Sequence, residues 1–230
     1  MTTQEVIRLL AQEYGVRRWQ RHGDPVSELI LTILSQNTSD VNTGRAFSSL
    51  LASFGSWEAV AEGDIEHIAQ AIRCGGLSRV KAARIKLILE TILAERGSLE
   101  LSFLGELPLP QAKAWLRQLP GVGPKTAGCV LLFSLGKPAL PVDTHLYRVA
   151  KRLGLIDSTV SVEQAHELLE HMVPSDAIYQ FHLNMIEHGR RVCKARNPRC
   201  HQCIFQEDCP SSEVRNGGEG KVSRVGSRGA

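Results

Sequence analysis

Four of the six cysteines in this 230-residue chain are crowded into seventeen residues, in the pattern Cys193-x6-Cys200-x2-Cys203-x5-Cys209. The first residues lack the apolar stretch of a secretion signal, so we expect a cytoplasmic protein whose thiols stay reduced. Four thiolates from one short segment can surround a metal centre. The pattern therefore predicts a loop of the fold that wraps around such a centre.

The spacing of these cysteines discriminates between kinds of centre. A structural zinc site usually contains two pairs of cysteines, and the members of each pair are close in sequence. Here only Cys200 and Cys203 form such a pair. The wide outer spacings favour a 4Fe-4S cluster, because its four ligands must reach around a larger object. Zinc and free thiols remain the alternatives. Cys74 and Cys129 lie beside apolar residues and are expected to be small core residues.

The rest of the chain has the apolar spacing of helices. No segment shows the sustained alternation of a half-buried strand, so the sequence predicts an all-α protein. The longest apolar runs are too short to span a bilayer, and no membrane partner is expected. Two patterns mark helix starts. Capping boxes are expected at Thr2 with Glu5 and at Ser161 with Gln164, and simple N-caps at Asp24, Ser39 and Asp64; a long helix is expected from Ser78 to Gly97 and a short one from Pro124 to Leu135.

A tight turn with glycines two positions apart separates two expected short helices, Pro110–Leu119 and Pro124–Leu135. The segment Leu119–Ala127 reads Leu-Pro-Gly-Val-Gly-Pro-Lys-Thr-Ala and is typical of a helix-hairpin-helix element. Gly121 and Gly123 let a foreign group approach the backbone, where the free N–H groups of the turn favour an anion such as a DNA phosphate. An ordinary turn between helices is the alternative.

Lys125 follows this turn directly, and Asp143 stands eighteen residues later at the start of another expected helix. A lysine amine attacks carbon only after it has lost its proton, and a helix N-terminus and desolvation both disfavour the ammonium. A facing aspartate could take that proton or stabilise a cationic sugar. The plainer alternatives are a phosphate-binding lysine and an aspartate that caps its helix.

Together, Leu119–Ala127, Val142–His145 and the four-cysteine loop resemble the endonuclease III family of DNA glycosylases in order and spacing, over about residues 1–210. The resemblance implies a six-helix barrel domain with the helix-hairpin-helix, beside a smaller helical domain that holds a 4Fe-4S cluster. The expected boundaries are 17–137 for the barrel domain, 1–16 with 138–210 for the cluster domain, and 211–230 for a disordered tail rich in glycine and serine.

The same resemblance implies a base-excision-repair enzyme that acts on damaged double-stranded DNA as a monomer. It would be both a DNA glycosylase for oxidised pyrimidines and an abasic-site (AP) lyase. Lys125 would attack C1′ of a nucleotide rotated out of the duplex, and the resulting Schiff base would permit β-elimination, with Asp143 assisting.

The resemblance also implies a set of DNA contacts. Gln36 matches the glutamine that fills the space left by the flipped nucleotide, and Leu77 matches an apolar wedge on the opposite loop. As alternatives, Gln36 ends a helix and Leu77 is buried. The expected phosphate contacts are Gly121, Gly123, Lys194, Arg196 and Arg199. Pro124 departs from the family, which commonly has a basic residue there, and removes one possible phosphate contact.

Two other functions are compatible with these motifs. One is a monofunctional mismatch glycosylase, although such relatives lack the lysine found at Lys125. The other is a non-catalytic helix-hairpin-helix protein that binds DNA and carries an iron-sulfur cluster, in which Lys125 only contacts phosphate.

Overall fold

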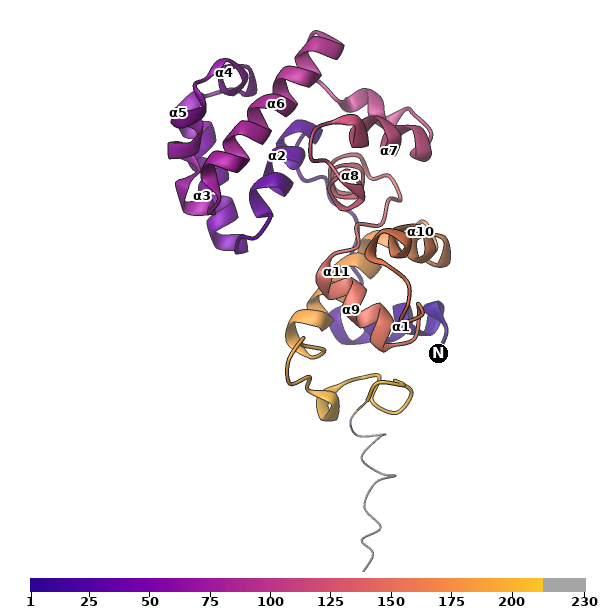
Figure 1. Cartoon of the computed structure of the whole chain (residues 1–230). Coiled ribbons are helices and arrows are strands. Elements are labelled where there is room, and N and C mark those ends of the chain that lie inside the picture. Colours follow the sequence, from indigo (N-terminus) through magenta and orange to yellow (C-terminus); the bar gives the residue numbers. More distant parts are fainter. Residues whose placement is uncertain (213–230) are drawn as a thin grey trace, which may run out of the picture. The chain divides into compact units, whose positions relative to one another are not determined.

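The computed structural model of the chain describes residues 1–212, which form helices and helical turns with no strand among them (Figure 1). The all-α prediction is therefore confirmed. Within the same residues, no helix combines the length and the apolar character needed to cross a membrane. Residues 213–230, most of the segment expected to be a tail, lie outside the described part. Ser212 is buried at 1% exposure, so the folded chain extends at least to this residue.

The chain divides into two compact units, at Arg17/Arg18 and again at Pro141/Val142. One unit is Arg18–Pro141, and the other combines Met1–Arg17 with the residues from Val142 onward. The boundaries expected from the sequence were 16/17 and 137/138.

The Arg18–Pro141 unit is built around helix α2, which is buried over most of its surface. The helices follow in the order α2 (Pro25–Ser35), α3 (Asp40–Phe54), α4 (Trp57–Glu62), α5 (Ile65–Ala71), η1 (Arg73–Gly75), α6 (Ser78–Arg96), η2 (Ser102–Gly105), α7 (Leu109–Gln118), α8 (Pro124–Cys129) and η3 (Val130–Ser134). Helix α2 packs against α3, α6, α8 and η3. The segment predicted as one helix from Pro124 to Leu135 changes to a π-helical turn at Val130.

Local capping explains where these helices begin. The side chains of Asp24, Ser39 and Asp64 each accept a hydrogen bond from the first turn of α2, α3 and α5, as predicted. Helix α6 differs, because its N-cap is Leu77 in the left-handed region and no side chain caps it. Its expected end is confirmed, since Gly97 forms the C-cap in the left-handed conformation.

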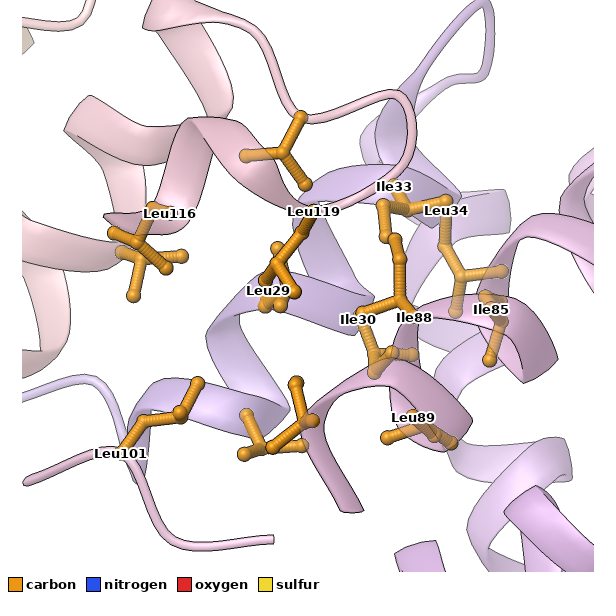
Figure 2. Close-up of a cluster of buried hydrophobic side chains, with 14 of the residues drawn as sticks. Leu29, Ile30, Ile33, Leu34, Ile85, Ile88, Leu89, Leu101, Leu116 and Leu119 are labelled. Atoms are coloured by element: carbon orange, nitrogen blue, oxygen red, sulfur yellow. The ribbon is translucent and has the colours of Figure 1, made fainter. Parts of the chain in front are cut away.

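The core of this unit lies between α2 and α6. Figure 2 shows Leu29, Ile30, Ile33 and Leu34 of α2 together with Ile85, Ile88 and Leu89 of α6, all of them inaccessible to solvent. Apolar side chains on every side of α2 make it the central helix of the unit. The consequence for function is that Glu28 and Thr32, two polar residues of α2, are held inside the unit.

The other unit contains α1 (Thr3–Tyr14), α9 (Thr144–Arg152), α10 (Val162–Met172), α11 (Ile178–Arg191) and η4 (Cys200–Gln202). Both predicted capping boxes are present, at the start of α1 and of α10. Helix α11 packs against α1 and α9. The buried Asn184 of α11 donates to the carbonyl oxygens of Leu10 and Gly15 and accepts from Arg17, which fixes α1.

Candidate functional site

The turn between α7 and α8 has the hairpin geometry expected from its glycines. The N–H of Val122 donates to the carbonyl of Leu119 at 3.1 Å and closes the turn. Gly121 has φ +72°, a conformation that favours glycine, and both Gly121 and Gly123 are exposed. Pro124 lies in the first turn of α8. Backbone N–H groups in the first turn make no hydrogen bond within the helix, so a proline there costs none.

Lys125 is the second residue of α8 and is half-buried, and its positive charge lowers the pKa of the Glu28 carboxyl group on α2. Cys129 follows one helical turn later on the same helix. Cys129 is buried, as expected, and burial raises the pKa of its thiol. The prediction that Cys129 is a small core residue is therefore confirmed.

Glu28 of α2 is a buried carboxyl residue in the same unit as Lys125. Its side chain is only 6% exposed, and its Oε1 accepts a hydrogen bond of 3.4 Å from the hydroxyl of Thr32. Its Oε2 is buried without a hydrogen-bond partner in the described residues. Burial raises the pKa of Glu28 to about 7, while the hydrogen bond from Thr32 and the ammonium of Lys125 oppose the rise.

Asp143 belongs to the other unit and is the N-cap of α9. Its Oδ1 accepts a hydrogen bond of 2.7 Å from the N–H of Leu146. The preceding N–H, that of Val142, donates to Nδ1 of His166 at 3.3 Å. Asp143 therefore caps its helix through Oδ1, as one of the two predictions for this residue stated. The cap holds the side chain in a defined orientation.

Gln36 and Leu77 lie on two neighbouring loops of the Arg18–Pro141 unit. Gln36 is the C-cap of α2, as one alternative held, and its Oε1 accepts a hydrogen bond of 2.8 Å from Nη1 of Arg84. Leu77 is 60% exposed with φ +49°, so the buried alternative is wrong for this residue. A leucine that is both exposed and in the left-handed region is strained, and such strain is concentrated at functional sites.

A buried lysine joins these two loops. The ammonium of Lys81 donates to the carbonyl of Leu34 at 2.7 Å, to the hydroxyl of Thr38 at 2.7 Å and to the carbonyl of Gly75 at 2.8 Å. The side chain of Thr38 also donates to the carbonyl of Gly75. Lys81 is 3% exposed, and its desolvation lowers the pKa. Its three hydrogen bonds hold the loops that carry Gln36 and Leu77 as one element.

The four-cysteine loop surrounds a cavity of about 270 Å³. Cys193, Cys200, Cys203 and Cys209 all line it. Four thiols around a space of this size fit a polynuclear cluster better than a lone tetrahedral zinc. Cys74, by contrast, is exposed, so the prediction that it is a small core residue is wrong.

Basic side chains from α9 support this loop. Nη1 of Arg152 donates to Sγ of Cys193 at 3.4 Å and to the carbonyl of Lys194 at 2.7 Å. Nε of Arg148 donates to the carbonyl of Cys193 at 3.0 Å. Burial raises the pKa of Cys203 to about 11, so a nearby positive charge is needed before this thiol ionises.

The predicted basic contacts of this loop differ in exposure. Arg196 and Arg199 are exposed, whereas Lys194 is half-buried. Their positions on the cysteine loop follow directly from the sequence. Other residues of the candidate site were missed, because a charged residue in a helical pattern usually indicates a solvated face; these are Glu28, Lys81, Arg84, Arg148 and Arg152.

The chain matches two protein families. The HhH-GPD superfamily of base excision DNA repair proteins matches residues 30–175, and the iron-sulfur binding domain of endonuclease III matches residues 193–209. The second match covers the segment with all four cysteines that line the cavity, and it agrees with the predicted 4Fe-4S cluster.

Named relatives agree with these families. Endonuclease III of Thermotoga maritima is 36% identical over 217 residues, which is 93% of this chain and 97% of that protein. A protein of Arabidopsis thaliana named as a DNA glycosylase is 40% identical over 79% of this chain, and the match spans 63% of its own length.

A solved structure agrees as well. An endonuclease III trapped in a covalent intermediate with DNA superposes with a TM-score of 0.79 at 29% identity, covering 94% of this chain and 99% of that one. The all-helical fold of this chain is thus similar to that of a solved endonuclease III. The chain belongs to the endonuclease III family of the HhH-GPD superfamily.

Proposed function

We propose that this protein is a bifunctional DNA glycosylase and AP lyase of base excision repair that removes oxidised pyrimidines from duplex DNA. The observation that carries the proposal is the position of Lys125, directly after the exposed glycine hairpin, in a chain of the endonuclease III family. The chemistry requires a nucleophilic amine beside a surface that DNA phosphates can approach. The hairpin supplies both.

In the proposed reaction, Nζ of Lys125 attacks C1′ of the everted nucleotide and the damaged base leaves with the electrons of its glycosidic bond. Ring opening gives a Schiff base, and loss of a proton from C2′ then breaks the strand on the 3′ side by β-elimination. Asp143 is proposed to stabilise the positive charge that develops on the sugar. The roles of both residues rest on the family motif and on their types.

The proposed DNA contacts fall into two classes. Gln36 and Leu77 would fill the space that the everted nucleotide leaves, and the loops that carry them are already held together by Lys81. Exposed backbone and basic side chains would bind phosphate without reading sequence; these residues are Gly121, Gly123, Lys194, Arg196 and Arg199. A steep loss of binding with added salt is expected.

The cluster is proposed to have a structural role. When bound, it ties together the loop from Cys193 to Cys209 and so fixes the basic residues that this loop carries. We also propose that the protein acts as a monomer, because the contacts assigned to DNA come from one chain. The cytoplasmic location expected from the sequence stays a prediction.

Borohydride trapping tests the proposed function. The protein is incubated with a duplex that contains thymine glycol or a preformed abasic site, and cyanoborohydride reduces any Schiff base to a stable adduct. We expect an adduct with the natural chain and with Lys113→Ala, a control on α7, and none with Lys125→Ala. Base release without an adduct would indicate a monofunctional glycosylase, and DNA binding with neither would indicate a non-catalytic protein.

A further inference from the structure

The imidazole of His188 lies at the cavity that the four cysteines surround. His188 is 1% exposed and lines this cavity. Its carbonyl accepts a hydrogen bond of 2.9 Å from the N–H of Cys193, just after α11 ends. Its ring nitrogen Nε2 lies 3.6 Å from Sγ of Cys203, within hydrogen-bond distance for sulfur. One buried residue therefore contacts two of the four cysteines, one through its backbone and one through its ring.

The other ring nitrogen of His188 has a partner on the N-terminal helix of the same unit. Nδ1 lies 2.9 Å from the hydroxyl oxygen of Tyr14, the last residue of α1. Two aromatic rings also contact the imidazole edge-on, that of Tyr14 at 5.9 Å and that of Phe205 at 5.2 Å between ring centres. Both ring nitrogens are thus partnered, and the ring is held in one orientation.

The direction of the hydrogen bond to Cys203 follows from its role as a ligand. A cysteine that binds a cluster is a thiolate and has no proton to donate. Its sulfur can only accept, so Nε2 of His188 must carry the hydrogen. In a neutral imidazole Nδ1 then has a free lone pair, which accepts the hydroxyl proton of Tyr14. Tyr14 therefore selects the tautomer in which an N–H faces the sulfur.

Cys203 accepts a second hydrogen bond, from the backbone. The N–H of Phe205 donates to the same Sγ at 3.4 Å. This donor belongs to the loop itself, whereas His188 belongs to α11. Hydrogen bonds to the sulfur ligands of an iron-sulfur cluster stabilise the added negative charge of its reduced form. The donor from His188 is the one that a side-chain substitution can remove while the sequence of the cysteine loop stays intact.

We propose that His188 donates a hydrogen bond from Nε2 to the Cys203 thiolate when the cluster is bound, and thereby raises the reduction potential of the cluster. Tyr14 is the positioning residue that sets the tautomer of His188. Partners of this kind, behind the direct ligands, tune many metal sites. The inference goes beyond the proposed function, because it concerns the cluster and does not depend on the chemistry of Lys125.

The test is the reduction potential of the cluster-loaded protein, measured by voltammetry without DNA. His188→Leu removes the donor, and we expect its one-electron equilibrium to shift about tenfold toward the oxidised form, a potential lower by about 59 mV. His188→Gln keeps an N–H near the position of Nε2 and should stay within about twofold of the natural chain. Tyr14→Phe no longer fixes the tautomer, so we expect an intermediate shift of about threefold.

A matched control removes the same hydroxyl elsewhere in the unit. Tyr147 of α9 is half-buried like Tyr14, but its hydroxyl donates to the carbonyl of Val160 at 2.6 Å. Tyr147→Phe should therefore leave the potential unchanged. The iron content of each variant is measured alongside, so that potentials are compared at equal loading. Recovery of the natural potential in His188→Gln, which a role in packing alone would not produce, assigns the effect to the N–H group.

A potential of His188→Leu equal to that of the natural chain would show that the proposal is wrong. If His188→Leu does not retain its cluster, Tyr14→Phe decides, because it leaves the imidazole in place. A lowered potential at full iron content then supports the proposal, and an unchanged one overturns it. Failure of the natural chain to form a borohydride adduct would reject the proposed function, but it would leave these potentials unaffected.

Discussion

Nη1 of Arg84 donates a hydrogen bond of 2.8 Å to Oε1 of Gln36 and so joins the middle of α6 to the end of α2. The same guanidinium covers Gly121, where a Cβ atom would lie 2.7 Å from its Nε. One side chain therefore contacts both the loop proposed to enter DNA and the hairpin proposed to bind phosphate. Gln36 is held in place before DNA arrives.

The first prediction concerns this pair. Arg84→Met and Gln36→Ala should each weaken binding to a duplex with an uncleavable abasic analogue, because each removes the hydrogen bond that orients the glutamine. In a double-mutant cycle we expect a coupling energy of about 1 kcal/mol, measured from the dissociation constants. Strictly additive effects would show that the hydrogen bond does not contribute to binding.

The two hairpin glycines should respond differently to substitution. Gly121→Ala places a side chain at φ +72° and against Arg84, so we expect a loss of about 1 to 2 kcal/mol in stability. Gly123→Ala meets open space and has an ordinary φ, so its melting temperature should stay close to that of the natural chain. Thermal unfolding of the two variants checks this, and equal losses would contradict the geometry.

Lys81 is expected to be essential to the two loops. Lys81→Met leaves three acceptors without their donor, and we expect a loss of about 2 to 4 kcal/mol in the free energy of unfolding. Lys86→Met is the matched control on α6, because Lys86 also donates to two carbonyl groups but is more exposed. Denaturant unfolding should show the smaller loss for Lys86→Met, together with unaltered DNA binding.

Glu28 should make the stability of the chain depend on pH. Its folded pKa of about 7 lies above its ordinary value of 4.5, so the folded state binds this proton more tightly than the unfolded state. Glu28 therefore leaves stability unaffected below pH 4.5 and lowers it progressively as the pH rises through 7, by about 3 kcal/mol in full. Glu28→Gln should raise the melting temperature at pH 8 and leave it unchanged at pH 4.5. A constant difference at both pH values would contradict the assignment.

Arg152 is predicted to stabilise the cluster. Arg152→Met removes the donor to Sγ of Cys193 and to two carbonyl groups of the cysteine loop. We expect faster loss of iron and of the broad absorption near about 400 nm on exposure to air. Arg196→Met, an exposed change in the same loop, should retain its iron. Equal rates of loss would show that Arg152 does not protect the cluster.

Local features of the chain were predictable because their interactions join residues close in sequence. The capping boxes at Thr2 and Ser161 and the N-caps at Asp24, Ser39 and Asp64 each span two or three residues. The four cysteines and the hairpin before Lys125 are likewise contained in short segments. Spacing along the chain was sufficient to indicate a cluster and a phosphate-binding turn.

Residues whose roles depend on distant partners could be placed only by the tertiary structure. Lys81 and Glu28 are charged residues of the kind that usually lie on a solvated helix face, yet both are buried. Glu28 belongs to α2, which packs against α3, α6, α8 and η3, whereas Lys81 belongs to α6 and has three acceptors for its ammonium. Cys74 lies among apolar residues in sequence but is exposed.

The physical reason is the range of the interactions. Caps, turns and ligand spacings are set by backbone geometry within a few residues, so the sequence alone determined the helices, the hairpin and the cysteine motif. Burial and hydrogen bonding between helices depend on which faces pack together. The tertiary structure alone therefore decided that Lys81 joins two loops, that Arg84 orients Gln36, and that Glu28 is buried inside its unit.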